Sequence, residues 1–430
     1  SPSFVDQPSF PLPGDLASAP RDGASRMGSR RARAEANGAN EARRDPFAPF
    51  MPVANRPPLV MSRGSGSYLW DESGRRYLDV IQGWAANALG HAAPELLATL
   101  AEQAQLLINP SPAFYNRPAI ELAQLLTRLT DSAEVAFFNS GAEANETSIK
   151  LARKWGRKHK RGAFRIISTL GAFHGRTLAA MAASGKPGWD VLFPPYPPGF
   201  TKVPFGDLDA IERAVDSDTV ALLVEPIQGE AGAVMPPPGY LKGLRELADR
   251  HDLLLILDEV QTGMGRLGQL LAQDCAGVRA DVTTLGKGLG AGLPISAVLV
   301  NERAACFELG DNGSTHGGNP LLCQVALVVC RIISQPAFLA GVRRRALQLE
   351  SALIGLAAAW GGVHWRGQGL LQALVFQAPI AERLRDAALA EGLLVNAARP
   401  NVLRFMPQLR ISEAEIRELV AGLERAHSRC

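Results

Sequence analysis

The chain lacks the residue patterns of a disulfide-bonded or metal-binding protein. Its 430 residues include only five cysteines and seven histidines, with no Cys-x-x-Cys, His-Glu-x-x-His or His-x-His spacing. The cysteines are scattered at Cys275, Cys306, Cys323, Cys330 and Cys430. We therefore predict reduced thiols, which fit a cytoplasmic location, and no metal ion.

The sequence also has no long apolar run and little net charge. No stretch approaches the roughly 18 uninterrupted apolar residues of a membrane-spanning helix. Lysine and arginine number 45 against 42 aspartates and glutamates, and the resulting net charge of +3 is too small to indicate a polyanionic partner. With 47% hydrophobic residues, the composition predicts an ordinary globular protein without a membrane or nucleic-acid partner.

One local basic run allows two interpretations. Residues 153–161, RKWGRKHKR, carry an interleaved Trp155, as a nucleic-acid-binding patch does. The run also ends a predicted helix that begins near Glu143 and Glu146, so acids and bases lie at the helix ends whose partial charges they complement. We favour the second interpretation and keep a non-catalytic nucleic-acid-binding protein as the alternative.

The first 45 residues differ from the rest of the chain. They are rich in Pro, Ser, Ala, Gly and Arg, and they show no apolar period. We predict that residues 1–45 form a disordered leader.

After this segment, helical periods alternate with short apolar strands. A β-hairpin is expected in residues 66–83, around a Ser-Gly turn. Helices are predicted near residues 94–107, 117–130, 142–158 and 239–250, and a final helix is opened by a capping box at Ser412. Strands are predicted at AEVAFF, AFRIIS, TVALLVEP, LLLILD, DVTTLG, ISAVLV, LLQALVF and NVLRFM. Continuous apolar strands between helices indicate an α/β fold with a mostly parallel sheet covered on both faces.

Three chemically useful features follow the ends of predicted strands. The turn Ser140-Gly141-Ala142 opens a helix whose free N–H groups could seat a phosphate, although an ordinary turn with a serine N-cap is an equal alternative. Asp258 ends a buried strand, where a carboxylate is costly without a cation or a capped turn. Lys287 follows a strand within TTLGKGLGAGLP, where it is either solvated or bonded to a flat ligand.

Two possible nucleotide-binding motifs lack the neighbouring residues and elements that such sites require. GMGRLG at 263–268 fits the dinucleotide fingerprint, but four residues separate it from the strand end at Asp258 and no good helix follows. A phosphate-binding loop ending at Lys287 would need glycine at 281 and serine or threonine at 288, where the chain has Asp281 and Gly288. A nicotinamide-dependent dehydrogenase is therefore a poor third hypothesis.

One ligand accounts for the phosphate seat, the strand-end acid and the lysine together. Pyridoxal phosphate has a dianionic phosphate, a ring nitrogen that must be protonated, and an aldehyde that condenses with an amine. The carboxyl ends of strands in one α/β sheet are also where such folds build their sites.

In combination, the motifs resemble those of a known family. NSGAEANE, FHGRT, VEPIQGEAG, LDEVQTGMGR, TLGKGLG, GSTHGGNP and VLRFMP occur in this order from about Phe47 almost to the end. They resemble the class III (ω-amino acid) aminotransferases of fold-type I, the pyridoxal phosphate-dependent fold, and are most similar to the acetylornithine and ornithine aminotransferases. The resemblance implies a large domain, residues 92–331, with a mostly parallel seven-stranded sheet. A smaller α+β domain would come from both chain ends, residues 46–91 and 332–430.

The resemblance also assigns cofactor contacts residue by residue. Lys287 would bind the cofactor covalently and then carry the proton between carbons, and Asp258 would pair with the ring nitrogen. The remaining contacts would be phosphate binding by Ser140, Gly141 and Ala142, ring stacking by Phe173, and pairing of the phenolic oxygen with Gln261. Thr315, from GSTHGGNP, would reach the phosphate in a neighbouring subunit, which implies a homodimer. His174 could be catalytic by residue type, but we expect it to pack near the ring face.

Substrate contacts follow from the same resemblance. Arg176 would grip a substrate carboxylate, since arginine pairs with carboxylates in a planar, bidentate manner. Glu230 and Arg404 would form a switch: Glu230 would neutralise Arg404 while the amine donor is bound, and would swing aside for 2-oxoglutarate.

Three departures from the family pattern affect these expectations. Ala54 and Trp84 stand where ornithine δ-aminotransferases carry tyrosines that recognise a free α-amino group, and His316 replaces a more usual aromatic residue. The first two favour an Nα-acylated substrate. The resemblance thus implies a ping-pong transfer of the δ-amino group of N2-acetylornithine to 2-oxoglutarate, as in arginine biosynthesis. Ornithine δ-aminotransferase, succinylornithine aminotransferase and 4-aminobutyrate aminotransferase remain the alternatives within the class.

Overall fold

The computed structural model describes residues 46–430, so the predicted leader at 1–45 lies outside the described residues. The chain divides into two compact units, with the boundary between Leu59 and Val60. Of the first unit, residues 46–59 are described and form turns without a helix or strand. The second unit, Val60–Cys430, contains all the elements below, and the domain boundaries predicted within it stay predictions.

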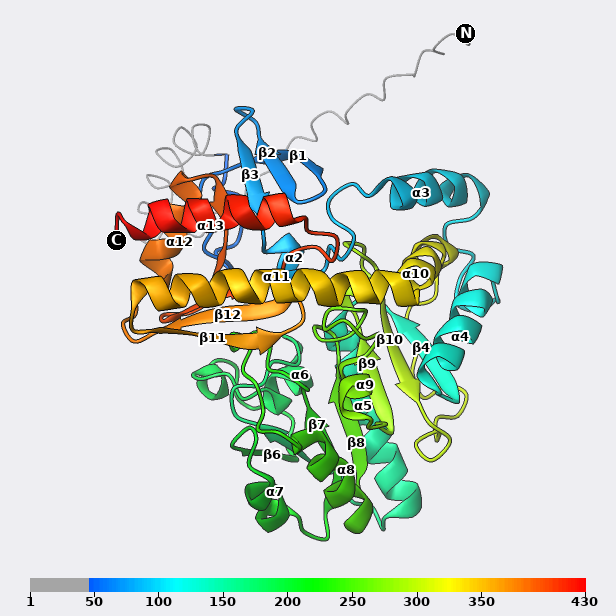
Figure 1. The fold of residues 1–430 in the computed structure, drawn as a ribbon. Helices are drawn as coiled ribbons and strands as arrows, with labels where there is room; N and C mark the ends of the chain where they lie inside the picture. The colour runs from blue at the N-terminus through cyan, green and yellow to red at the C-terminus, as the bar shows by residue number, and fades with distance from the viewer. Residues whose placement is uncertain (1–45) are drawn as a thin grey trace, which may run out of the picture. The chain divides into compact units, whose positions relative to one another are not determined.

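A seven-stranded sheet forms the centre of the second unit (Figure 1). Its strand order is β4 (Glu134–Phe138), β10 (Ser296–Val300), β9 (Val282–Leu285), β8 (Leu254–Asp258), β7 (Thr219–Val224), β5 (Arg165–Thr169) and β6 (Phe200–Val203). Only β10 runs antiparallel to its two neighbours, whereas β9, β8, β7, β5 and β6 pair in parallel. The predicted mostly parallel, seven-stranded α/β sheet is confirmed.

Alternate residues of the central strands pack on opposite faces of this sheet. In β8, Leu254 and Ile256 belong to a buried cluster with helix α5 (Gly141–His159). Leu255 and Leu257 belong to a second cluster with helix α8 (Tyr240–Arg250). Because side chains of a strand alternate between its faces, the continuous apolar run of β8 is what a sheet covered on both sides requires.

Further helices flank or connect the strands. They are α2 (Gln82–Ala85), α3 (Pro94–Leu106), α4 (Arg117–Thr130), α6 (Leu178–Ala183), α7 (Leu208–Ala214), α9 (Ala272–Ala276) and α10 (Pro320–Ile333), with 3₁₀ turns η1 (Trp189–Val191) and η2 (Lys287–Leu289). Across residues 46–430, no single helix is both long and apolar enough to cross a membrane. One bent pair, α10 with α11 (Pro336–Trp360), reaches that length and composition only when its two helices are joined.

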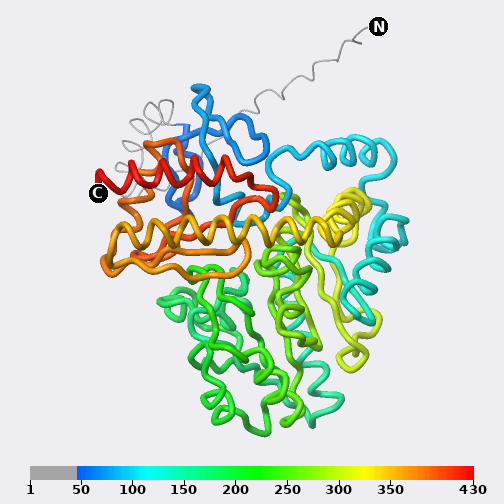
Figure 2. Tube along the Cα trace, in the orientation of Figure 1, coloured from blue at the N-terminus to red at the C-terminus, as the bar shows by residue number. Residues whose placement is uncertain are grey.

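Two small sheets contain strands from the beginning and the end of the second unit, and the first of them combines both ends. The first contains β1 (Met61–Ser65), β2 (Tyr68–Asp71), β3 (Arg76–Asp79) and β13 (Leu393–Leu394), and the second contains β11 (Val363–Gln368), β12 (Leu371–Phe376), β15 (Val402–Phe405) and β14 (Asn396–Arg399). Leu393 of β13 pairs in parallel with Leu78 of β3, which brings the blue and orange parts of the chain side by side in Figure 2. Helices α11, α12 (Ala381–Ala390) and α13 (Glu413–His427) contact strands of these sheets.

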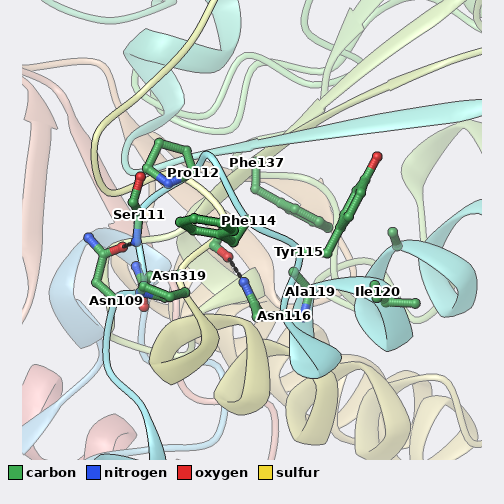
Figure 3. Close-up of a pocket in the computed structure, with 14 residues that line it drawn as sticks. Asn109, Ser111, Pro112, Phe114, Tyr115, Asn116, Ala119, Ile120, Phe137 and Asn319 are labelled. Carbon is green, nitrogen blue, oxygen red and sulfur yellow. Dashed lines mark hydrogen bonds between the residues drawn. The ribbon is translucent and has the colours of Figure 1, made fainter.

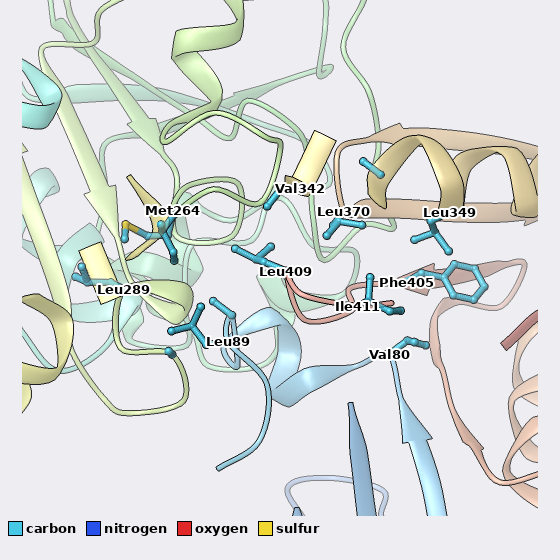
Figure 4. Close-up of a cluster of buried hydrophobic side chains, with 14 of the residues drawn as sticks. Val80, Leu89, Met264, Leu289, Val342, Leu349, Leu370, Phe405, Leu409 and Ile411 are labelled. Atoms are coloured by element: carbon cyan, nitrogen blue, oxygen red, sulfur yellow. The ribbon is translucent and has the colours of Figure 1, made fainter. Parts of the chain in front are cut away.

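One large buried cluster joins the small sheets to the central sheet. Figure 4 shows Val80, which follows β3, and Phe405 of β15 in the same cluster as Leu349 of α11 and Leu289, which ends η2. The turn that contains Lys287 therefore packs on a core formed by residues from both ends of the second unit. Burying each large aliphatic side chain in such a core contributes roughly 1.5–3 kcal/mol.

The basic run at the end of α5 is occupied by contacts within the chain. Lys154 pairs with Glu308 at 2.8 Å and with Asp311, and Lys158 pairs with Glu308 at 2.7 Å. The Trp155 ring is buried and donates its indole N–H to a backbone carbonyl at 2.9 Å. These contacts support the helix-end interpretation of the run, because a stacking aromatic and free cations are what single-stranded nucleic acid would need.

Candidate active site

A cavity of about 260 Å³ lies where five strands of the central sheet end. Its lining comes from the segments that follow β4, β5, β7, β8 and β9 at their carboxyl ends. The lining residues are Gly141, Ala142, Asn145, Phe173, His174, Gly175, Glu225, Glu230, Asp258, Val260, Gln261 and Lys287. The structure thus brings together the phosphate seat, the acid and the lysine that the sequence placed at strand ends.

Lys287 begins the 3₁₀ turn η2 directly after β9 and faces this cavity. Its backbone φ is +37°, an uncommon conformation for a residue with a side chain. Burial, reinforced by the nearby charge of Arg404, lowers the pKa of the Lys287 amine to about 8, although Asp258 and Glu225 oppose the shift. A lysine with a lowered pKa has a larger unprotonated fraction, which is the form that attacks an aldehyde.

Three hydrogen-bond donors hold the carboxylate of Asp258, which lines the cavity. Its Oδ2 atom accepts hydrogen bonds from Asn145 Nδ2 at 2.9 Å and from His174 Nδ1 at 2.7 Å, and Oδ1 accepts from the Val260 N–H at 3.0 Å. Burial alone would raise the pKa of this carboxyl, but these bonds and the imidazole outweigh burial and lower it. Asp258 therefore stays ionised at neutral pH.

His174 has a larger role than the packing residue that we expected. Its Nδ1 atom bonds to Asp258, while its buried Nε2 atom has no hydrogen-bond partner among the described residues. The bond to Asp258 is a polar contact that we did not predict, whereas packing of the ring near the cofactor stays a prediction. The general rule that a buried strand-end carboxylate needs a cationic or donating partner was the signal that could have identified it.

Asn145 and Glu225 also belong to the site and were not predicted. Asn145 lies one turn into α5 and links Asp258 to Thr284. The Thr284 hydroxyl donates to Asn145 Oδ1 at 2.9 Å. Glu225 follows β7 and accepts the backbone N–H groups of Phe173 at 2.9 Å and Gly229 at 3.2 Å. Burial raises the pKa of Glu225 to about 7. Both residues fix the backbone around the cavity.

The N-terminus of α5 opens on the same cavity. Ser140 caps the helix by accepting the Glu143 N–H at 3.2 Å, and Gly141 and Ala142 line the cavity. A Cβ atom on Gly141 would lie 2.8 Å from Val260 Cγ1, so only glycine lets the helix end approach the segment after β8 this closely. The free N–H groups and the helix dipole make this end suitable for a phosphate.

The predicted switch residues are close to the cavity but not paired with each other. Arg404 is only 3% exposed and donates to the Gly229 carbonyl at 2.7 Å and to Gln261 Oε1 at 3.1 Å. Glu230 instead pairs with Lys186 at 2.8 Å and with Arg399 at 2.9 Å. The two described side chains of Glu230 and Arg404 form no ion pair with each other, and the pairing expected with the amine donor bound stays a prediction.

The remaining predicted residues are Phe173, Arg176, Trp84 and Thr315. Phe173 lines the cavity, with its ring centroid 5.5 Å from that of Trp189. The exposed Arg176 guanidinium lies 6.0 Å from the Phe173 ring, and Trp84, 54% exposed, lies 6.0 Å from the Arg404 guanidinium. Thr315 is exposed and is not part of this cavity.

These residues fit pyridoxal phosphate in chemistry and in arrangement. A helix end for the phosphate, an ionised acid for the ring nitrogen and a low-pKa amine for the aldehyde line one cavity. Asp258 Oδ1 accepts only one hydrogen bond from the described residues, which leaves capacity for another donor. No group of three or more metal-ligating side chains occurs in residues 46–430.

Comparison with known proteins identifies the family. The model of the class-III aminotransferases matches residues 50–427. The chain belongs to the class-III aminotransferases. It is 50% identical over 378 residues to acetylornithine aminotransferase 2 of Bordetella pertussis, covering 87% of this chain and 96% of that protein.

Solved structures of similar proteins agree. The N-acetylornithine aminotransferase of Stenotrophomonas maltophilia matches with a TM-score of 0.77 and 37% identity, over 87% of this chain and 96% of that one. The ornithine aminotransferase of Toxoplasma gondii, in a structure with pyridoxal phosphate at partial occupancy in the active site, matches with a TM-score of 0.86 and 32% identity, over 95% of this chain and 98% of that one. The protein is a pyridoxal phosphate-dependent transaminase.

Proposed function

We propose that this aminotransferase moves the δ-amino group of N2-acetylornithine to 2-oxoglutarate in a ping-pong reaction. The observation that carries the proposal is the 50% identity to a Bordetella pertussis protein named acetylornithine aminotransferase, over nearly the full length of both chains. Ala54 and Trp84, in place of the tyrosines expected in ornithine δ-aminotransferases, support an acylated donor.

Each residue at the inner end of the cavity has a defined task in this proposal. When bound, pyridoxal phosphate supplies an electron sink that makes a proton on the amine-bearing carbon acidic. Lys287 accepts that proton at Nζ and returns it to the neighbouring position. Asp258 would keep its charge next to the ring nitrogen, and Ser140, Gly141 and Ala142 would hold the phosphate. Phe173 would stack on the ring, and Gln261 would hold the phenolic oxygen.

The outer end of the cavity binds substrate carboxylates. Arg176 is exposed and lies 6.0 Å from the ring of Phe173, which lines the cavity, so it would meet the carboxylate far from the reacting carbon. Arg404 is buried deeper and receives the carboxylate next to the reacting carbon of 2-oxoglutarate. Planar guanidinium groups suit both tasks because they donate two parallel hydrogen bonds to one carboxylate.

A donor comparison tests the substrate. Steady-state assays with 2-oxoglutarate and equal concentrations of acetylornithine, ornithine, succinylornithine or 4-aminobutyrate are expected to give the highest kcat/KM for acetylornithine. A clear preference for ornithine would overturn the substrate while leaving the reaction class intact.

We also propose a cytoplasmic homodimer in which Thr315 reaches the neighbouring subunit's cofactor site. Thr315 does not line the second cavity of about 260 Å³, but Asn109 and Gly317 do, together with the aromatic rings of Phe114, Tyr115 and Phe137 (Figure 3). Phe114 and Tyr115 are 69% and 95% exposed, and Asn109 donates to the Thr315 carbonyl at 3.2 Å. Exposed aromatic surface of this kind is typical of an interface. Analytical ultracentrifugation is expected to show a dimer of the wild type and a monomer of Tyr115→Asp.

A further inference from the structure

The carboxylate of Glu230 is held by two cations from different parts of the chain. Lys186, between α6 and η1, places Nζ 2.8 Å from Oε1, and Arg399, at the end of β14, places Nη2 2.9 Å from Oε2. A second bond from Arg399 Nη1 reaches Oε1 at 3.3 Å. Burial would raise the pKa of Glu230, but the bonds from Arg399 and Lys186 outweigh it and lower the pKa. Both carboxylate oxygens are thus engaged, and all three side chains are about one quarter exposed.

Arg404, by contrast, is held by neutral oxygens. Besides Gly229 and Gln261, its Nε atom donates to Asn396 Oδ1 at 2.9 Å. Asn396 lies directly opposite Arg404 in the β14–β15 hairpin, so the backbone register itself places this acceptor. Among the described residues, no side chain or carbonyl accepts a hydrogen bond from Arg404 Nη2.

The charge balance explains why Glu230 stays where it is. Turning Glu230 to Arg404 would give up bonds to two partly buried cations in exchange for bonds to one. Charge-assisted hydrogen bonds are roughly twice as strong as neutral ones, so this exchange is unfavourable as long as both Lys186 and Arg399 are present. Together, the side chains of Lys186, Arg399, Arg404 and Glu230 carry three positive charges and one negative charge, an excess that favours an incoming anion.

We infer that Lys186 is a positioning residue that, together with Arg399, holds Glu230 away from Arg404 and leaves Arg404 open to the carboxylate of the amino-group acceptor. The inference rests on the proposed function for the identity of that acceptor as a dicarboxylic 2-oxo acid. Binding of the acceptor then requires no displacement of Glu230. Arg404 tolerates the amine donor because neutral oxygens already satisfy part of its donor set.

The variant Lys186→Met tests this role. Without the ammonium group, Glu230 is free to turn toward Arg404 and compete with the acceptor. We expect the KM for 2-oxoglutarate to rise about 10-fold and the KM for the amine donor to change by less than about 2-fold. The dissociation constant of glutarate, an unreactive dicarboxylate, measured by calorimetry on the holoenzyme, is expected to rise in parallel.

Three further variants separate positioning from general damage. Lys186→Arg keeps the charge and is expected to behave like the wild type. Lys186→Met combined with Glu230→Gln is expected to restore glutarate binding, because a neutral amide does not neutralise Arg404. Lys242→Met, an exposed lysine on α8, is the matched control and is expected to change nothing.

Several results would overturn the inference. They are an equal rise of both KM values, unchanged glutarate binding in Lys186→Met, or no recovery with arginine at 186 or with the double variant. The glutarate measurement does not use the amine donor, so it stands even if the donor comparison assigns the wild type to another ω-amino acid.

Discussion

The two ends of the active-site cavity each contain a buried or half-buried carboxylate, but they hold it in opposite ways. Asp258 is fixed by the buried amide of Asn145, the buried imidazole of His174 and the backbone N–H of the partly buried Val260. Glu230 is fixed by two long cationic side chains that remain about one quarter exposed. The Asp258 end is thus built from short, mostly neutral groups, whereas the Glu230 end is built from long, charged side chains that balance one another.

This difference corresponds to what each end is expected to bind. A cofactor stays in place through every turnover, so its acid can be held rigidly and kept ionised at a buried site. Two different substrates must enter at the outer end in turn, and the ion pairs of Glu230 with Lys186 and Arg399 leave Arg404 open to the carboxylate of one of them. Substitutions at the two ends should therefore affect different kinetic constants.

The largest effect is expected from Asp258→Asn at the rigid end. The amide has the same shape but cannot hold a ring nitrogen in its protonated form, so kcat should fall by about 100-fold or more with both substrates. Turnover of the purified holoenzyme measures this. The matched control is Asp281→Asn, a buried aspartate beside the amino end of β9, which should retain the kcat of the folded protein. A kcat near the wild-type value in Asp258→Asn would show that the acid does not act on the cofactor.

Arg404→Lys should separate the two substrates. An ammonium group cannot reproduce the forked set of bonds to Gly229, Gln261 and an incoming carboxylate, so kcat/KM for 2-oxoglutarate should fall by about 100-fold. The half-reaction with the amine donor, measured in single turnovers, should lose less than about 10-fold. Equal losses in both half-reactions would contradict a role specific to the acceptor; Arg410→Lys, whose guanidinium pairs with Glu95, serves as the control.

The pH dependence of cofactor uptake should report the Lys287 amine. With its pKa lowered to about 8, about one tenth of the amine is unprotonated at pH 7, against about one part in 3,000 for an ordinary lysine. The rate at which cofactor-free protein binds pyridoxal phosphate covalently should rise about 10-fold from pH 6 to pH 7 and level off above pH 8. A rate still rising steeply from pH 9 to pH 10 would mean that Lys287 has an ordinary pKa.

The smallest effect is expected from Ser140→Ala at the helix end. Loss of the cap should lower the free energy of unfolding by about 1 kcal/mol and weaken cofactor affinity by about 5-fold. Ser412→Ala removes an equivalent cap from α13, so it should cost similar stability while leaving cofactor affinity unchanged. Equal cofactor affinities in the two variants would remove Ser140 from the phosphate site.

Much of the fold could be predicted from the residues because the central strands are uniformly apolar. Strands β7, β8 and β9 lie within two residues of the predicted TVALLVEP, LLLILD and DVTTLG segments. Strand β6 (Phe200–Val203) was missed, since it is short, contains Lys202 and forms the edge of the sheet. An edge strand is stabilised by one neighbour and needs no continuous apolar run.

The residues of the candidate active site were also predictable only in part. Residues that follow a strand directly, such as Lys287 and Asp258, were predictable because parallel strands end at one edge of the sheet. The roles of Asn145 and His174 depend on contacts across 113 and 84 residues of sequence, for which local patterns carry no signal. The pairing of Glu230 with Lys186 and Arg399 depends on competition among several cations, which no single motif records.

The central claim is that Lys287 is the residue that carries the cofactor. Reduction of the yellow holoenzyme with borohydride, followed by proteolysis and mass mapping, tests it directly. The peptide that contains Lys287 should gain the mass of the reduced pyridoxal phosphate adduct in stoichiometric amount, and Lys186 should remain unmodified. An unmodified Lys287, or an adduct on any other lysine, would contradict the assignment of this cavity as the active site.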